Sequence, residues 1–457
     1  MSTLLRIGSL LKVGFGEAGA DIIRQSLPQN SSGNLDLSFK SRTIQSGVNV
    51  SCIFLFCDIR NYTDTTECLR EEVFVFTNKI AEVVHSISHS FGGYANKNIG
   101  DAFLISWILE EENKARSVFA RGQSAVNATS CQADKALLSV IKIILALNYE
   151  SFFLSDLSEK TRKSLVERLS DNVGSIVKMG FGLHTGRAVQ GVIGSERKLD
   201  ATYISNVVEQ VEYLESSTKR YGTKLLMSGE FYKLLQIENR RKCRLVDKVV
   251  FLTEETNTFE TLEPENFEKM EIYTYDMDTN DLVERNGTKS LLCSKDDSSN
   301  NIVDNQSIHG TSFLHESSVH SDAQSETGPT HLLKTTRGRR LSVWAKPKED
   351  VSLRHIESKV KNEHTILTLP SQPIIYKQSL WNTVEMKQIR KRFVGSNFFD
   401  TFSRGLEAYF TGRWKDARTH FEFTRDRFDD GPSIYFLKKM DETDNVLPRG
   451  FKGWNEA

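Results

Sequence analysis

Two aspartates stand at the ends of apolar segments, where their carboxylates are placed to take part in chemistry. Asp58 follows the almost wholly apolar run 51–57, which predicts a buried strand that ends at Asp58. Asp101 lies just past Ile99-Gly100, where two short apolar segments meet in a predicted hairpin. If the hairpin pairs beside the first strand, the two carboxylates face each other and repel.

The residues themselves leave two interpretations of this pair. Divalent cations bound to phosphate oxygens would compensate both negative charges, because hard cations favour carboxylate oxygens. Alternatively, Asp58 and Asp101 are turn residues whose carboxylates face water. The strand and hairpin patterns do not decide between a metal site and two hydrated turns.

The residues around both aspartates resemble a known family. Residues 55–63, Leu-Phe-Cys-Asp-Ile-Arg-Asn-Tyr-Thr, and residues 97–103, Lys-Asn-Ile-Gly-Asp-Ala-Phe, are similar to the two metal-binding motifs of class III nucleotide cyclases. With later segments, the resemblance covers about residues 48–280. It implies an α+β domain with a ferredoxin-like βαββαβ core. It also implies an adenylyl cyclase that converts ATP to cyclic AMP and pyrophosphate.

The resemblance assigns the metal site to three residues. The carboxylates of Asp58 and Asp101, with the backbone carbonyl of Ile59, would hold two Mg²⁺ or Mn²⁺ ions in each productive site. Such composite sites form between two cyclase domains arranged head to tail. One domain brings the metals and the other brings the remaining groups.

Phosphate binding is implied at two further places. Asn61, Tyr62 and Thr63 precede a predicted long helix and would offer backbone amides to the β- and γ-phosphates. Arg197 occupies the position where the metal-bearing domain of animal membrane cyclases has a phosphate-contacting arginine. The alternative is that Arg197 is a hydrated loop charge, but we favour the phosphate contact.

Two residues match the positions that read the base in this family. Lys97 stands where adenylyl cyclases carry a lysine and guanylyl cyclases a glutamate, because adenine N1 accepts a hydrogen bond. Thr202 stands where a partner group accepts from the adenine amino group. Both identities favour ATP, although they do not exclude GTP.

The complementary half of the site departs from the family pattern. The family places an asparagine that orients the ribose and, four residues later, an arginine that neutralises charge at the α-phosphate. Those positions are Glu209 and Tyr213 here. The family also has a lysine near the end of the domain, and the corresponding position here, Leu252-Thr253, has none. Since losing one oriented transition-state donor costs on the order of 100- to 1,000-fold, we expect a site built from these residues to be nearly silent.

The metal-binding half matches the family and the complementary half does not, which predicts a heterodimer with a second cyclase chain. A homodimer would place Glu209 and Tyr213 in both pockets, whereas a complete second cyclase chain would restore one of them. Three alternatives remain: a regulatory pseudo-cyclase that binds nucleotide or only dimerises, a slow homodimeric cyclase, and a scaffold that acts through its C-terminal region. Related protist cyclases also indicate an upstream membrane or sensor protein as a partner.

The predicted elements follow the order strand, helix, hairpin, helix and strand, with the sheet covered on one face. Residues 108–135 are charged and small, which indicates a surface insertion. Further elements are predicted at 206–221, 224–227 and 270–275. The core segments are the strand 51–57, a helix 69–90, the hairpin near residue 100, a helix 134–148, and a strand pair at 176–184 and 187–193.

Composition shifts divide the chain into four parts. Residues 1–47 predict helices and a polar link, with the alternative of a transmitter segment, and residues 48–280 form the cyclase domain. Residues 281–352 are rich in Ser, Asn, Asp and Thr, which predicts a disordered linker, and Ser342 follows Arg-Arg-Leu as in substrates of cyclic-AMP-dependent kinase. Residues 353–457 include a predicted helical hairpin that resembles one tetratricopeptide repeat. One repeat cannot bury its own apolar face, so we expect it to dock on the cyclase domain.

Charge, cysteine content and hydropathy bear on the binding partners and the cellular compartment of the protein. The 59 Lys and Arg residues balance the 60 Asp and Glu residues, so no global charge directs the chain to nucleic acid. The six cysteines show no metal-type pairing, which favours reduced thiols in a cytoplasmic protein. Lys142 interrupts the longest apolar run, so we predict no transmembrane segment and membrane association only through a partner.

Overall fold

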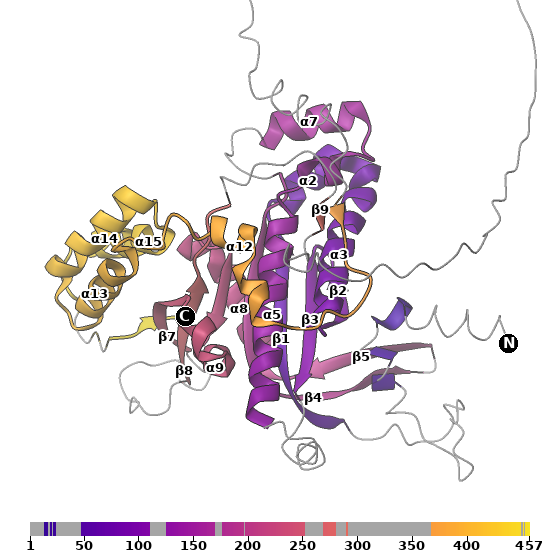
Figure 1. Cartoon of the computed structure of the whole chain (residues 1–457), viewed down its shortest axis with the longest axis horizontal. Coiled ribbons are helices and arrows are strands. Elements are labelled where there is room, and N and C mark those ends of the chain that lie inside the picture. The colour runs from indigo at the N-terminus through magenta and orange to yellow at the C-terminus, as the bar shows by residue number, and fades with distance from the viewer. Residues whose placement is uncertain are drawn as a thin grey trace, which may run out of the picture. The chain divides into compact units, whose positions relative to one another are not determined.

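The computed structural model describes residues 13–16, 19–20, 22–23, 47–109, 125–169, 176–195, 197–251, 268–279, 289–290, 367–448, 451 and 453–457. The chain divides into two compact units, residues 1–294 with 352–457, and residues 295–351. All described residues belong to the first unit, which Figure 1 shows in colour.

A mixed sheet of nine strands forms the centre of this unit, and its strand order is β11-β7-β8-β6-β4-β1-β3-β2, with β5 paired to β4. The core order β4-β1-β3-β2 confirms the predicted ferredoxin-like arrangement. The strands are β1 (Val48–Ile59), β2 (Tyr94–Ile99), β3 (Ala102–Leu109), β4 (Met179–Ser195), β5 (Lys198–Ile204), β6 (Leu225–Ser228), β7 (Cys243–Phe251), β8 (Glu268–Tyr275) and β11 (Asn455–Glu456).

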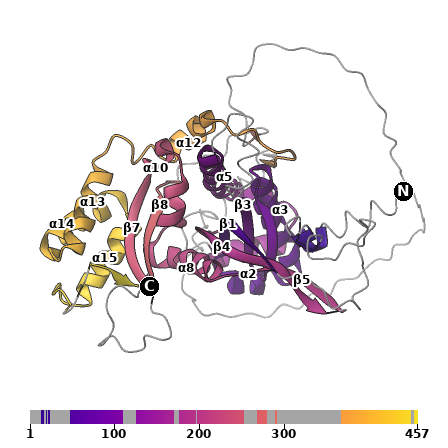
Figure 2. The same ribbon diagram turned by 90° about the horizontal axis from the view of Figure 1, so that it is seen from below.

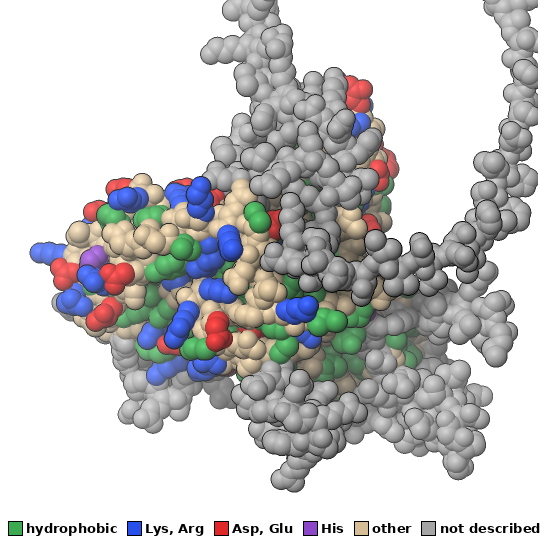
Figure 3. All heavy atoms as spheres, viewed as in Figure 1, with side chains coloured by type: hydrophobic (Ala, Val, Ile, Leu, Met, Phe, Trp, Pro, Cys, Tyr) green, Lys and Arg blue, Asp and Glu red, His purple; other side chains and the backbone are tan. Residues whose placement is uncertain are grey.

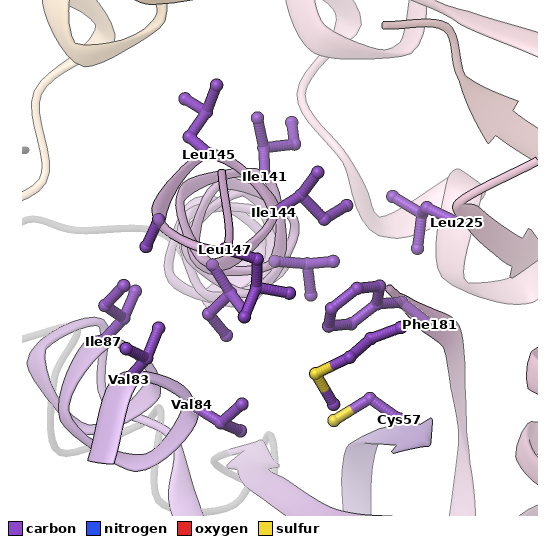
Figure 4. Close-up of a cluster of buried hydrophobic side chains, with 14 of the residues drawn as sticks. Cys57, Val83, Val84, Ile87, Ile141, Ile144, Leu145, Leu147, Phe181 and Leu225 are labelled. Carbon is purple, nitrogen blue, oxygen red and sulfur yellow. The ribbon is translucent and has the colours of Figure 1, made fainter. Parts of the chain in front are cut away.

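Helices α3 (Val73–Ser90) and α5 (Ala125–Ala146) cover one face of the sheet. The apolar stripe of α3, which includes Phe76, Ile80 and Val84, is buried as its helical spacing predicts. Figure 4 shows residues of α3 and α5 pointing into the same apolar cluster as Phe181 of β4. This packing anchors the strands whose ends carry Asp58 and Asp101.

The other face of the sheet is also covered, so the prediction of a one-sided sheet is wrong. Helix α8 (Asn206–Tyr221) lies across it, opposite α3 and α5 (Figure 2). Successive residues of β1 point to opposite faces, and both Ile53 and Phe54 are fully buried. The continuous apolar run of β1 therefore reflects burial on both faces rather than on one.

The predicted strand pair at 176–184 and 187–193 is also wrong. These residues form the single strand β4, which extends past the end of β1 and pairs with β5 in a long arm. The arm folds over the second sheet face, where the ring of Tyr203 meets that of Phe54 at 5.1 Å. Residue Ile22 is buried in the same cluster.

The region before α3 is broken into shorter pieces than the predicted helix 69–90. Helix α2 (Tyr62–Leu69) is followed by the 3₁₀ helix η1 (Arg70–Glu72), and the break falls at Arg70, which has a φ of 52°. The predicted insertion 108–135 is wrong at both ends, because β3 reaches Leu109 and α5 begins at Ala125, and residues 110–124 lie outside the described residues. Helices α6 (Glu150–Leu154) and α7 (Glu159–Leu169) then lead toward β4.

Short elements connect the remaining strands. Lys289–Ser290, inside the predicted disordered linker, form β9 and pair in parallel with β10 (Leu367–Thr368). No helix among the described residues has the length and apolar character needed to cross a membrane. The connecting helices are α9 (Gly229–Leu234), α10 (Ile237–Arg240), η5 (Gln378–Asn382) and α12 (Val384–Gln388).

The C-terminal region contains three helices rather than a hairpin: α13 (Phe398–Phe410), α14 (Trp414–Phe428) and α15 (Gly431–Asp441). Figure 3 shows acidic and basic side chains mixed over this region. The region docks on the catalytic sheet as expected, since β11 pairs with β7 and the rings of Tyr435 and Tyr221 lie 4.6 Å apart. Gly431 permits this approach, because a Cβ there would collide with the carbonyl oxygen of Tyr221.

A buried charge network fixes the same contact. Arg244 of β7 donates to Asp276 at 2.6 Å and to Asp430 at 2.9 Å, and all three side chains are buried. Asp430 also caps α15 by accepting from the backbone N–H of Ser433 at 3.0 Å. One guanidinium thus ties the sheet to the start of α15.

Candidate active site

The ends of β1 and β3 bring Asp58 and Asp101 together. Asp58 pairs with Ala102 in the β1–β3 register, and the backbone N–H of Ile59 donates to the carbonyl oxygen of Asp101 at 3.3 Å. Burial and the neighbouring charge of Asp101 raise the pKa of Asp58, while Arg60 opposes this shift. The two carboxylates therefore form an acidic pair at one edge of the sheet.

This donor set fits a hard divalent cation. The negative charge of Asp101 helps to raise the pKa of Asp58, and a bound cation would relieve the same repulsion. Among the described residues no group of three or more His, Cys, Asp or Glu side chains forms a metal cage. A site of two carboxylates leaves coordination positions for substrate oxygens and water.

The start of α2 lies directly beside this edge. Asn61 precedes the helix in the left-handed region, with a φ of 55°, and makes no side-chain cap. The hydroxyls of Tyr62 and Thr77 lie 3.2 Å apart, which connects α2 to α3. Thr63 belongs to the first turn, so the three predicted phosphate-binding residues occupy a helix N-terminus next to Asp58.

A buried ion pair joins β1 to α8 just behind the acidic edge. Arg60 and Glu215 lie 2.7 Å apart, and their side chains are 13% and 5% exposed. Burial raises the pKa of Glu215 to about 7, although Arg60 acts in the opposite direction. Gly180 makes room for the pair, because a Cβ there would collide with both side chains.

The predicted base-reading residues are in contact within this chain. The Lys97 ammonium on β2 donates to the Thr202 hydroxyl on β5 at 3.1 Å. It also donates to the Asp200 carboxylate at 2.9 Å. The arm formed by β4 and β5 makes this contact possible, because it folds back toward β2.

The two positions that depart from the family pattern, Glu209 and Tyr213, lie on α8 and have different surroundings. Glu209 is exposed in the first turn, and its charge helps to raise the pKa of Glu212. Tyr213 packs its ring 5.0 Å from that of Phe251. Tyr213 is thus an apolar packing residue here, and Glu209 is a surface charge.

Arg197 is separated from the acidic pair. Gly180, near the start of β4, pairs with Asp58, whereas Arg197 follows the end of that strand, at the tip of the arm. Its backbone N–H donates to the Ser195 hydroxyl at 3.3 Å, and its side chain is exposed. A single chain therefore does not bring Arg197 to its own Asp58, and its phosphate role stays a prediction.

Two acidic partners were missed by reasoning from the sequence. Asp200 lies two residues before Thr202 on the same strand, so the period-2 rule places both on one face toward Lys97. Glu215 could have been sought as the partner of Arg60, because a buried guanidinium requires a carboxylate. Ser342 and Leu252-Thr253 lie outside the described residues.

Comparison with known families locates the catalytic region. The family model described as adenylate and guanylate cyclase catalytic domain matches residues 44–261. A second model, described as the RasGEFs all helical domain, matches residues 1–28. The first match includes every predicted site residue except Ser342.

Curated relatives carry the same domain. An adenylate cyclase of Anabaena cylindrica is 29% identical over 197 residues, which is 43% of this chain and 33% of the relative. The terminal-differentiation-specific adenylate cyclase of Dictyostelium discoideum is 25% identical over 224 residues, 48% of this chain and 9% of the relative. The chain thus spans a third or less of the length of these two relatives.

A solved bacterial light-regulated adenylyl cyclase is similar over 60% of this chain and 61% of its own, with 19% identity and a TM-score of 0.39. At this score the assignment rests on the sequence match, and the strand order agrees with it. Residues 44–261 therefore belong to the adenylate and guanylate cyclase catalytic domain family, the class III nucleotide cyclases.

Proposed function

We propose that this chain is an adenylyl cyclase subunit that supplies the metal-binding half of a site shared with a second class III cyclase chain. The observation that carries the proposal is the contrast within one domain. Asp58 and Asp101 stand together at an intact acidic edge, whereas Glu209 and Tyr213 replace the residues that the family uses on α8. This asymmetry is why we assign the metal-binding half of the shared site to this chain and the other half to the partner.

The acidic edge has a defined task in this proposal. Asp58, Asp101 and the carbonyl of Ile59 would hold two Mg²⁺ or Mn²⁺ ions, which when bound offset phosphate charge and promote attack by the ribose 3′-oxygen on the α-phosphate. The amides of Asn61, Tyr62 and Thr63 orient the terminal phosphates.

The ion pair between Arg60 and Glu215 holds the end of β1 against α8 behind that edge. It positions the strand end that carries Asp58.

The partner chain supplies what α8 lacks. An exposed carboxylate at Glu209 would repel a triphosphate, and the Tyr213 ring, which packs on Phe251, offers no cation to the reacting phosphorus. The partner's own ribose-orienting and charge-neutralising residues would complete one pocket. The second pocket, built from this chain's α8, would stay nearly inactive.

ATP is the favoured substrate. Both relatives described above are named adenylate cyclases, and Lys97 with Thr202 matches the family's adenine-reading pair. In the productive pocket the partner would read the base, so these two residues indicate ancestry rather than the specificity of the complex.

A reconstitution experiment tests the proposal. We expect Asp58→Ala in this chain to reduce cyclic AMP output from the complex with a complete partner by about 100-fold or more, because the metal site loses a ligand. Asp64→Ala is the matched control, since Asp64 is an exposed acid on α2 whose charge pairs with Arg168. Unchanged output from the Asp58 variant would exclude the proposal.

A second candidate is a regulatory pseudo-cyclase that dimerises with an active cyclase without donating metal ligands. The contacts of Lys97 with both Asp200 and Thr202 favour it, because they occupy the ammonium that a base would need. This candidate predicts that the Asp58 variant retains full output. The same experiment therefore separates the two functions.

A further inference from the structure

A cavity of about 270 Å³ lies at the end of the sheet where β1 stops and β4 begins. It is bounded by the ends of α5 and α8 and by the start of β6. Neither Asp58 nor Asp101 lines it. The lining residues of interest are the cations Arg60, Lys178, Lys219 and Lys224 and the polar residues Asn148, Thr218, Thr223 and Thr279.

The charged side chains that line this cavity are all positive. Its lining includes four cationic side chains and no carboxylate. The two acids nearby already have partners, since Glu215 pairs with Arg60 at 2.7 Å and Asp278 with Arg392 at 3.2 Å. The Lys178 side chain makes no hydrogen bond or ion pair with any residue that the structure describes.

Lys219 adds to this excess. It forms no direct ion pair within the described parts of the chain, although its charge partly opposes the burial that raises the pKa of Asp58 and of Glu215. The cavity thus holds more positive charge than the described protein groups neutralise.

Two residues that line the cavity each carry a buried polar atom without a hydrogen-bond partner among the described residues. The Nη1 atom of Arg60 and the hydroxyl of Thr223 are both buried, and neither makes a hydrogen bond among the described residues. Leaving a buried donor unsatisfied costs free energy, and for a charged group the cost is greater.

The ammonium groups also crowd one another. Desolvation of its ammonium lowers the pKa of Lys224 to about 8, although the residue as a whole is exposed; Lys178 contributes in the same direction and Asp278 opposes it. The Lys224 ammonium donates to the Thr279 hydroxyl, which carries no charge to offset this repulsion.

We propose that this cavity binds a phosphate-bearing anion with at least two negative charges. The fixed guanidinium of Arg60 and the ammonium groups of Lys178 and Lys224 would contact its oxygens, because phosphate oxygens accept charge-assisted hydrogen bonds from both groups. The volume exceeds that of a single phosphate. It accommodates either a free diphosphate or the phosphates of a small organic molecule.

An apolar wall of the cavity provides a way to distinguish a free diphosphate from an organic phosphate. Ile144 and Leu147 of α5 and Phe181 of β4 belong to one apolar cluster (Figure 4), and all three also line the cavity. An organic body could lie against this wall, whereas free pyrophosphate would use only the charged side. Affinities for pyrophosphate and ADP therefore distinguish the sources.

The test measures binding to the full chain by isothermal titration calorimetry, with EDTA present and ionic strength fixed. EDTA removes divalent ions, so phosphates have no metal bridge to the acidic edge. We expect pyrophosphate or ADP to bind with one-to-one stoichiometry. Lys178→Gln with Lys224→Gln should weaken binding at least about tenfold, because two charge-assisted contacts are lost.

The matched control is Lys198→Gln with Lys233→Gln, which removes the same charge from exposed positions outside the cavity. This control should retain affinity within about twofold. If the cavity variant does not fold, Lys219→Gln tests the same site from an exposed position.

Tighter binding of ADP supports an organic phosphate, and equal or tighter binding of pyrophosphate supports a free diphosphate. Absence of binding by both probes would overturn the proposal. So would equal loss of affinity in the cavity variant and the control. None of these results depends on cyclic AMP formation, so the proposed function stands or fails separately.

Discussion

The acidic edge and the exposed face of α8 belong to the same domain, yet they differ in how far they keep their chemistry. At the edge, Asp58 and Asp101 are adjacent, and a helix N-terminus lies beside them. On α8, Glu209 faces solvent and Tyr213 packs against Phe251. Under the proposed function, only the acidic edge has groups suited to binding a metal-bound triphosphate.

If the proposed function holds, this difference means that the fold and the catalytic groups of one region can be retained separately. Helix α8 still covers the sheet, because Val211 and Leu214 are fully buried regardless of what the exposed positions carry. Its Glu215 still pairs with Arg60 behind the acidic edge. The buried face of α8 and its ion pair with Arg60 thus do not depend on which residues stand at Glu209 and Tyr213.

The first prediction concerns a variant that gives α8 the two residue types that the family has there. Glu209→Asn combined with Tyr213→Arg should raise cyclic AMP formation by the isolated chain on the order of 100-fold, because it restores a ribose donor and a cation at the α-phosphate. The rate with ATP and Mn²⁺ measures the change.

The control for that variant is Glu212→Asn with Ser216→Arg, which makes the same charge change three residues further along the exposed side of α8. It should leave the rate of the isolated chain unchanged. Brisk turnover by the unaltered chain would contradict the comparison, since it would show that Glu209 and Tyr213 do not limit the site.

The second prediction tests what holds the C-terminal helices on the sheet. Arg244→Met should lower the free energy of unfolding by about 3–5 kcal/mol, because Asp276 and Asp430 would be left buried without their cation. Denaturant unfolding of the full chain measures this loss.

Arg404→Met serves as the comparison variant, because the Arg404 and Asp400 side chains are both 65% exposed. It should change stability by less than about 1 kcal/mol. Similar losses in the two variants would mean that the Arg244 network does not anchor the C-terminal helices.

The third prediction carries the smallest effect. Lys97→Met should leave the output of the heterodimer within about twofold, because the partner reads the base in the productive pocket. Lys198→Met, on the exposed β5 arm, is the control. A loss of tenfold or more at Lys97 alone would place this chain's own base-reading pair in the working pocket.

Local sequence patterns determined the parts of the fold that depend on neighbouring residues. The bounds of α8, predicted at 206–221, are those observed, because its apolar spacing and its Ser205 cap lie within the segment. The juxtaposition of Asp58 with Asp101 followed from a strand and a hairpin that had to pair. Resemblance to a family then supplied roles that geometry alone left open.

Contacts between distant segments required the tertiary structure. The sequence pattern predicts two strands where the structure has the single strand β4, because nothing local shows that a glycine-rich strand extends past its neighbour. The curvature of the β4–β5 arm brings Asp200 to Lys97, and α8 brings Glu215 to Arg60.

The cavity cations Lys178, Lys219 and Lys224 likewise come from different elements. Sequence patterns specify which face of an element is apolar, whereas only packing decides which charges end up side by side, since each element can rotate and shift until the shared core is filled.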